Sequence, residues 1–164
     1  MTTESTQPRS AAIPLRWYEI QHIVTFGETS GVGFVYFSHL FTWQGECRER
    51  FGYEHCPEYM RYMRGLTGEL TMLTCTASCE YLGEMWVGDL ISVRLSIPWV
   101  RLHFMKGEFA FYRLRDDMEE LVARGEQTWA STRRAGSFFT PAPWPQDVLD
   151  ACTLFGSDLT RALR

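Results

Sequence analysis

The stretch from Phe26 to Phe51 constrains the fold most, because a glycine-rich turn runs directly into an apolar helix there. The turn, Gly27 to Gly33, holds three glycines, which favour tight or left-handed backbone. From Val35 onward, apolar residues recur at spacings of three and four: Phe37, Leu40, Phe41, Trp43, Cys47 and Phe51. This pattern predicts a helix ending near Gly52 that is apolar around most of its girth and therefore buried. The start of such a helix offers free backbone N–H groups and favours an oxyanion.

Composition excludes several classes of function. A chain of 164 residues forms one domain of ordinary size. The net charge of −4 and the single lysine, Lys106, argue against a nucleic-acid surface. No apolar run approaches the roughly 20 residues of a membrane span, so we expect a soluble protein that does not insert into a membrane.

The cysteines and histidines indicate a reducing compartment and no metal site. The five cysteines are odd in number, form no C-x-x-C pair and follow no signal peptide, so we expect reduced thiols and a cytoplasmic location. No histidine stands at metal-ligand spacing from a cysteine or aspartate.

Alternation and turn residues predict the elements around the central helix. A strand at Arg16–Phe26 precedes it, and a short helix at Pro57–Arg64 follows it. Four more strands are predicted at Leu70–Leu82, Leu90–Ile97, Glu108–Leu114 and Glu119–Arg133. The last begins with residues that also suit a helix, but Gly125 and a threonine-rich run favour a strand. Ala135–Pro145 reads as an irregular crossing, and an amphipathic helix capped by Asp147 closes the chain at Asp147–Leu163.

The predicted order of elements specifies an α+β fold. We expect a disordered arm at 1–14, a single domain at 15–145 and a C-terminal helix at 146–164. An antiparallel sheet of about five strands has one face that must be covered, and the long helix does this by lying across it. A sheet wrapped around one central helix is the hot-dog arrangement.

The motif from Val24 to Phe51 resembles the signature of the 4-hydroxybenzoyl-CoA thioesterase family of hot-dog proteins. The shared features are an aromatic residue and glycine at a strand end, spaced acidic positions, a glycine, a hydrophobic-aromatic pair, and a helix with a tryptophan. The resemblance covers roughly Arg16 to Pro145. Within the family, W-Q-G-x-C-R-E-x-F at Trp43–Phe51 is most similar to the thioesterases of enediyne polyketide pathways. Those enzymes release a polyene β-ketoacyl chain from the acyl carrier domain of an iterative polyketide synthase, and the acid can then lose carbon dioxide.

The resemblance implies a thioester hydrolase that needs no cofactor, because the substrate is carried on the phosphopantetheine of a carrier protein. Its catalytic candidates are Arg48, Ser30 and Glu28. The wider family has a carboxylate at the position of Ser30, and the enediyne branch has an asparagine that works with the arginine matching Arg48. Serine can orient a water molecule but is no base near neutral pH. Phe34 also departs from that branch, which typically has a second asparagine there.

The remaining site expectations concern the oxyanion, the channel and the assembly. The backbone N–H groups of Tyr36 and Phe37 are the expected oxyanion donors, and Gly33, Phe34 and Phe41 are expected to line the substrate channel. Family members pair edge to edge and then stack. The resemblance therefore implies a homotetramer built from two dimers, with the acyl channel at the dimer interface.

Several alternatives stay open. Glu28 is either a general base or a turn residue that accepts backbone N–H groups. Arg48 lies among charged neighbours, so an ion pair within the helix is its plainer interpretation, and Cys47 reads as a packing residue. The other possible functions are a general acyl-CoA thioesterase, a hot-dog dehydratase, whose histidine-containing loop has no match here, and a non-catalytic acyl-binding module, which the missing carboxylate favours.

Overall fold

The computed structural model describes residues 13–64 and 70–162. Most of the predicted arm, the predicted break at Gly65–Gly68 and the last residues of the predicted C-terminal helix lie outside this part. The elements in chain order are β1 (Tyr18–Ile23), η1 (Phe26–Glu28), α1 (His39–His55), α2 (Pro57–Arg64), β2 (Leu70–Tyr81), β3 (Leu90–Arg101), β4 (Phe104–Arg115), β5 (Met118–Ala135), β6 (Phe138–Pro141), α3 (Gln146–Leu154) and β7 (Asp158–Arg161).

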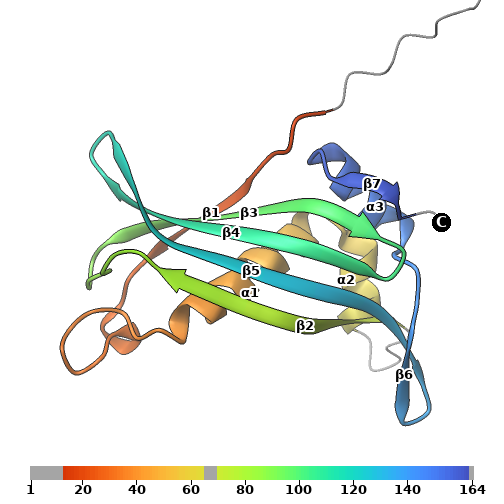
Figure 1. The fold of residues 1–164 in the computed structure, drawn as a ribbon. Coiled ribbons are helices and arrows are strands. Elements are labelled where there is room, and N and C mark those ends of the chain that lie inside the picture. Colours follow the sequence, from red (N-terminus) through yellow and green to blue (C-terminus); the bar gives the residue numbers. More distant parts are fainter. Residues whose placement is uncertain (1–12, 65–69, 163–164) are drawn as a thin grey trace, which may run out of the picture.

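The strands form one sheet that α1 crosses on one face (Figure 1). Five long strands follow the order β1-β3-β4-β5-β2, and all of them pair antiparallel. The short β6 adds to β5, and β7 pairs with β3 in parallel. The predicted α+β fold, an antiparallel sheet with a helix lying across it, is confirmed.

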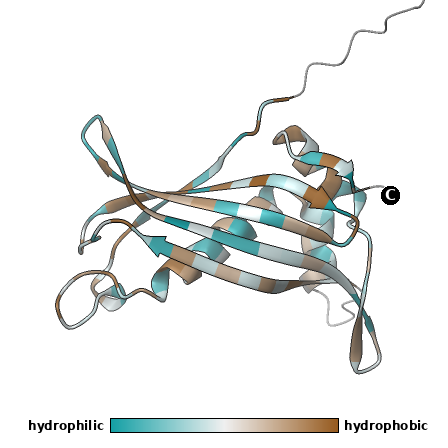
Figure 2. Cartoon of the chain, in the orientation of Figure 1, coloured by the Kyte–Doolittle hydropathy of each residue, from teal (hydrophilic) through white to brown (hydrophobic). Residues whose placement is uncertain are grey.

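The core lies between α1 and the sheet because each presents one apolar face, at helical spacing along α1 and at every second residue along the strands. Along β3, Ile91, Val93 and Leu95 are at most 1% exposed, and they belong to the same buried cluster as the α1 side chains Leu40, Trp43 and Cys47. Figure 2 shows hydrophobic and hydrophilic residues alternating along the central strands. Burying each large apolar side chain stabilises the fold by about 1.5–3 kcal/mol.

The opposite face of the sheet is polar and internally paired. Arg94 forms ion pairs with Glu19 and Glu119, and its guanidinium lies 4.5 Å from the centre of the Tyr112 ring. Farther along the sheet, Lys106 lies between Glu108 and Glu126. This face therefore satisfies its own charges.

The central helix differs from the prediction in its start and its burial. It begins at His39 rather than near Val35, because Val35 forms a bridge with Thr29, and Phe34 forms one with Trp86. These bridges hold the chain extended. The expectation of burial around most of the helix is also wrong, since only one face is buried: Leu40, Trp43, Gln44, Cys47, Phe51 and Gly52.

The predicted C-terminal helix is too long. Helix α3 ends at Leu154, and Gly156 then adopts a positive φ of 78°, which lets the chain leave the helix. Residues Asp158–Arg161 form β7 instead. Asp147 lies inside α3 and is not its N-cap, which is Pro145. Its two carboxylate oxygens accept the N–H of Val148 and the N–H of Tyr59 in the first turn of α2.

The other predicted elements are present with changed ends. Helix α2 matches its prediction, and the region of uncertain propensity at Met118–Ala135 is a strand. Strand β3 continues past Pro98 because the register with β4 shifts between Ser96 and Trp99. The predicted first strand extends too far, since Phe26 starts η1 and is 83% exposed.

Two glycine substitutions test the packing between strands. A Cβ atom at Gly107 would lie 2.1 Å from the Trp129 ring, so Gly107→Ala should destabilise the fold by about 1–3 kcal/mol. Gly45 in α1 has no neighbour within 4 Å of such a Cβ, so Gly45→Ala should stabilise by about 0.5–1 kcal/mol. Urea denaturation of both variants measures these changes, and a neutral Gly107→Ala would contradict the packing described here.

Candidate active site

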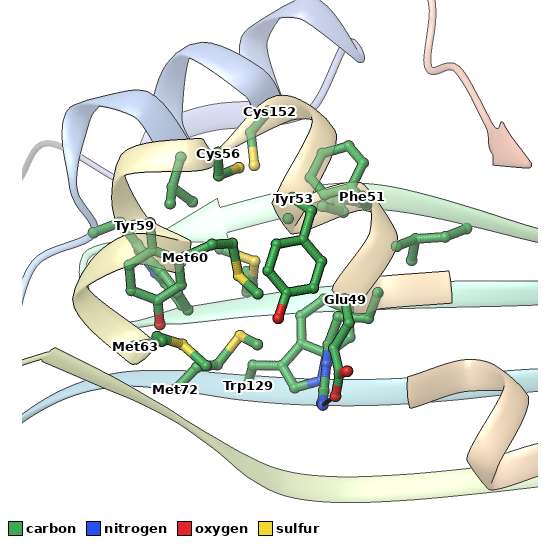
Figure 3. A pocket seen from close by; sticks show the side chains of 17 residues that line it. Glu49, Phe51, Tyr53, Cys56, Tyr59, Met60, Met63, Met72, Trp129 and Cys152 are labelled. Carbon is green, nitrogen blue, oxygen red and sulfur yellow. Dashed lines mark ion pairs between the residues drawn. The ribbon is translucent and has the colours of Figure 1, made fainter. Parts of the chain in front are cut away.

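Two of the hollows in the described part of the chain lie beside α1 and are lined by predicted site residues. The first is a cavity of about 240 Å³ between the second half of α1, the helices α2 and α3, and the sheet (Figure 3). The second, of about 580 Å³, lies at the start of α1 and the end of β2. Its lining includes Ser30, Val32, Phe34, Val35, Tyr36, Phe37, Leu40 and Tyr81. We call them the inner cavity and the outer hollow.

The inner cavity is lined mainly by aromatic and sulfur-containing side chains. The sulfur atoms come from Cys56, Met60, Met63, Met72, Met105 and Cys152. Thioethers are polarisable and adapt to ligand shape, so such a wall suits an unsaturated or flat apolar group. A cavity of about 150 Å³ is already enough to hold benzene.

Arg48 brings a charge to this apolar cavity. Its guanidinium donates to Thr74 Oγ1 at 3.1 Å and to Gln127 Oε1 at 3.3 Å, and Glu49 lies 3.7 Å away. Its Nε atom is buried and has no hydrogen-bond partner among the described residues. Burial lowers the pKa of Arg48, but an arginine stays protonated in proteins. The ion pair with Glu49 within the helix is therefore only one of several contacts of the Arg48 guanidinium.

A chain of buried amides holds Arg48 in place. Gln127 Oε1 accepts from both Arg48 and the indole N–H of Trp129, and Gln127 Nε2 donates to Gln44 Oε1. Sequence reasoning missed Gln44, Gln127 and Thr74. One available signal was the polar Gln44 on an apolar helix face, four residues before Arg48 and therefore on the same side of the helix.

The start of α1 offers one of the two expected oxyanion donors. The Tyr36 N–H is not free, because it donates to the Glu28 carbonyl at 2.8 Å. This corrects the expectation for Tyr36. Over the ranges 13–64 and 70–162, the Phe37 N–H has no acceptor, and its residue lines the outer hollow. Ser30 lines the same hollow, and its hydroxyl donates to the Phe34 carbonyl at 3.2 Å.

Glu28 is a fully engaged carboxylate. It accepts from the N–H and hydroxyl of Thr25, from the indole of Trp43 at 2.8 Å, and from the ring of His22. Burial alone would raise the pKa of Glu28, but the hydrogen bonds from Thr25, His22 and Trp43 outweigh it and lower the pKa to about 2. This environment favours the interpretation of Glu28 as a turn residue over that of a general base.

The predicted site residues divide between the two hollows. Within one protomer, Ser30, Phe34, Tyr36 and Phe37 line the outer hollow, whereas Arg48 lines the inner cavity. Glu28, Gly33 and Phe41 line neither. Gly33 has a φ of 96° and faces the Trp86 ring, so its role is to shape the turn.

Cys47 lies fully buried in the core. Burial raises the pKa of Cys47 to about 12, and its thiol faces the Val93 carbonyl, as expected for a packing residue. No cluster of three metal-ligating side chains occurs in the part of the chain that the structure describes. None of its helices is long and apolar enough to cross a membrane.

Comparison with known proteins identifies the family. No family model matches the sequence. The solved dynemicin thioesterase, reported with induced-fit and allosteric effects upon polyene binding, is 32% identical and superposes with a TM-score of 0.79. The match covers 85% of this chain and 96% of that one. The chain belongs to the hot-dog thioesterases.

More distant hot-dog thioesterases share the fold. The 1,4-dihydroxy-2-naphthoyl-CoA hydrolase of Prochlorococcus marinus is 23% identical over 125 residues, or 72% of this chain and 79% of its own. The solved 4-hydroxybenzoyl-CoA thioesterase is 14% identical with a TM-score of 0.72, covering 84% of this chain and 99% of that one. As a member of this family, the chain is a thioester hydrolase rather than a dehydratase or a non-catalytic acyl-binding module.

The Glu28 network makes a testable contribution to stability. Glu28→Gln should lower the free energy of unfolding by about 1.5–3 kcal/mol at neutral pH, because charged hydrogen bonds are lost. A carboxyl group whose pKa is lower in the folded protein than in the unfolded chain stabilises the fold at pH values above its unfolded pKa. The difference from wild type should therefore shrink as the pH falls from about 4.5 towards about 2.

Urea denaturation across this pH range measures the effect, and Glu84→Gln, at an exposed side chain, is the control. If Glu28→Gln is as stable as wild type yet inactive, Glu28 is a general base and the structural role assigned here is wrong.

Proposed function

We propose that this thioesterase hydrolyses a polyene β-ketoacyl thioester on the acyl carrier domain of an iterative enediyne polyketide synthase. The product is a free acid that can decarboxylate to a ketone or polyene. The observation that carries the proposal is the inner cavity, where Arg48 meets a wall of aromatic and thioether groups that suits a conjugated chain. The 32% identity to the dynemicin thioesterase supports the same class. We place the reaction in the cytoplasm, in keeping with the five free cysteines.

The proposed mechanism uses electrostatic stabilisation without a strong base. Arg48 provides a fixed positive charge in an apolar cavity, where charges interact more strongly than in water. The free N–H of Phe37 provides a further donor at the outer hollow, and the Ser30 hydroxyl, whose hydrogen goes to the Phe34 carbonyl, can orient a water molecule there as an acceptor. In this scheme water attacks the thioester carbonyl carbon, the C–S bond breaks, and the thiol of phosphopantetheine leaves with a proton from water.

Pairing of two protomers through β2 would join the two hollows. Strand β2 is a free edge of twelve residues with exposed apolar side chains such as Leu73 and Tyr81, and uncovered edges of this kind tend to pair. Antiparallel pairing about the strand's middle sets its Tyr81 end beside the partner's Leu70 end. The outer hollow lies at the first end, and Met72 of the inner cavity lies at the second. We therefore propose that each active site combines the outer hollow of one subunit with the inner cavity of the other.

We further propose a homotetramer in which two such dimers stack. The sheet face opposite α1 carries ion pairs such as Arg94–Glu119, so a stack on that face would be polar. Sedimentation at micromolar concentration should give a mass near four times 19.1 kDa, whereas a monomer alone would contradict both the pairing and the shared site. A stable dimer would keep the shared site and exclude the tetramer.

A carrier protein is the proposed donor, and a general acyl-CoA thioesterase is the second candidate. The CoA thioesters named for two relatives favour that candidate. Coenzyme A carries a 3′-phosphate that basic side chains usually bind. Arg94 and Arg101 are already paired with acids, which leaves Arg61, Arg133 and Arg134 as exposed candidates. Comparable turnover of carrier-bound and CoA-bound forms of one chain would overturn the carrier preference.

Mass spectrometry of a carrier protein loaded with a polyene β-ketoacyl chain tests the function. Addition of the enzyme should remove the acyl mass from the carrier and yield free acid or ketone. Arg48→Ala should slow this release about 10- to 1000-fold, the range for losing one electrostatic stabiliser.

Arg50→Ala is the matched control, since Arg50 lies on the same helix but pairs with Glu46 at the surface. A loaded carrier that stays intact with wild-type enzyme would refute the proposed substrate. Equal rates for Arg48→Ala and Arg50→Ala would refute the role of Arg48.

A further inference from the structure

Unpaired hydrogen-bond donors gather around the inner cavity. Six buried side-chain polar atoms in the described residues have no hydrogen-bond partner. Three of them, Arg48 Nε, Tyr59 Oη and Trp144 Nε1, belong to residues that line this one cavity. A buried donor without a partner costs free energy, so a native structure that keeps three together needs an explanation.

Tyr59 is one of the two donors, with Trp144, that the proposed mechanism does not use. It is 4% exposed, and its ring packs edge-on against Trp144 at 6.3 Å between centroids. In Figure 3 its hydroxyl points towards Met63 and Met72, which also line the cavity. Burial raises the pKa of Tyr59, so the group stays a protonated donor at neutral pH.

Tyr59 is held in place by its backbone and by its ring. Its backbone N–H donates to Asp147 Oδ2 at 2.8 Å, which ties the first turn of α2 to α3. Tyr59 and Arg48 line the same cavity, so two buried donors without a partner in the described part of the chain belong to its wall. An apolar ligand would leave the hydroxyl unpaired, whereas a ligand with an acceptor oxygen would satisfy it.

We propose that Tyr59 is a specificity-determining residue whose hydroxyl donates a hydrogen bond to an oxygen on the acyl chain beyond the thioester carbonyl. The enzyme therefore prefers acyl thioesters with such an oxygen, for example a 3-oxo group, over hydrocarbon chains of equal length. A site built to hydrogen-bond an oxygen rejects the analogue that lacks it. This inference rests on the proposed function, since it concerns the acyl group bound in the same cavity.

The experiment compares 3-oxodecanoyl and decanoyl pantetheine thioesters as substrates of wild type and Tyr59→Phe. In wild type, kcat/KM should be higher for the 3-oxo substrate. Tyr59→Phe removes one oxygen atom and should lower kcat/KM for the 3-oxo substrate about tenfold, the effect of one hydrogen bond. It should change the decanoyl value less than about twofold. An equal loss on both substrates, or no loss on either, would overturn the inference.

The melting temperature of Tyr59→Phe gives a second readout, because it should not fall although kcat/KM for the 3-oxo substrate does. Because the Tyr59 hydroxyl has no partner in the protein, Tyr59→Phe should keep or raise the melting temperature. Tyr18→Phe is the control, since the buried Tyr18 hydroxyl is hydrogen-bonded to Glu54 and Tyr18 does not line the cavity. That variant should lower the melting temperature and keep the wild-type preference for the 3-oxo chain. A drop in melting temperature with Tyr59→Phe would assign its hydroxyl a structural role.

Binding separates failure of this inference from failure of the proposed function. Trp129 and Trp144 line the cavity, so quenching of tryptophan fluorescence reports the dissociation constant of each thioester. If wild type hydrolyses neither thioester, the proposed function fails, and tighter binding of the 3-oxo form that Tyr59→Phe abolishes would still support the inference. Equal binding of the two forms by wild type would overturn it.

Discussion

The anchoring of Trp43 in the core governs how the rest of the structure is placed. Its ring lies 4.5 Å from the His22 ring and 6.4 Å from the Phe111 ring, which fixes α1 against the sheet. Its indole N–H donates to Glu28, so the same side chain also fixes the glycine-rich turn. One aromatic residue with a polar edge thereby sets both the angle of the helix and the path of the chain entering it. The outer hollow lies between the end of this turn, the start of α1 and the end of β2.

Buried polar side chains are a second constraint on the structure, because leaving one of them without a hydrogen-bond partner costs free energy. The amides of Gln44 and Gln127 are 0% and 4% exposed, yet they satisfy each other and leave an oxygen for Arg48. Such a network is stable only when each of its members is hydrogen-bonded. It holds the Arg48 guanidinium in one orientation, whereas a surface arginine is flexible. The fixed charge then faces an apolar cavity, where little solvent reorganisation accompanies charge development on a substrate. In the proposed mechanism, this preorganisation is what would allow a site without a well-placed basic carboxylate to stabilise an oxyanion.

The sequence predicted elements with a strong period and missed contacts between distant segments. Ile91, Val93 and Leu95 alternate so regularly that β3 could be placed correctly, and the motif at Trp43–Phe51 indicated the family that the dynemicin thioesterase confirms. The late start of α1 was not predictable, because it depends on the bridge between Phe34 and Trp86, which lie far apart in the chain. The pairing of Arg48 with Gln127 was hidden for the same reason. Local patterns contain no information on which strand a helical side chain will meet.

The free edge of β2 links assembly to chemistry. The Tyr81 hydroxyl, at the end of that strand, donates to the Phe37 carbonyl at 3.0 Å. This bond ties the start of α1, with its free Phe37 N–H, to the edge at which a second protomer is proposed to pair. Tyr81 is 46% exposed and Phe37 is 53% exposed in one protomer, so pairing there would bury both and exclude water from the oxyanion donor. Because hydrogen bonds to a developing charge strengthen as water leaves, pairing of the edges would complete the site electrostatically as well as sterically.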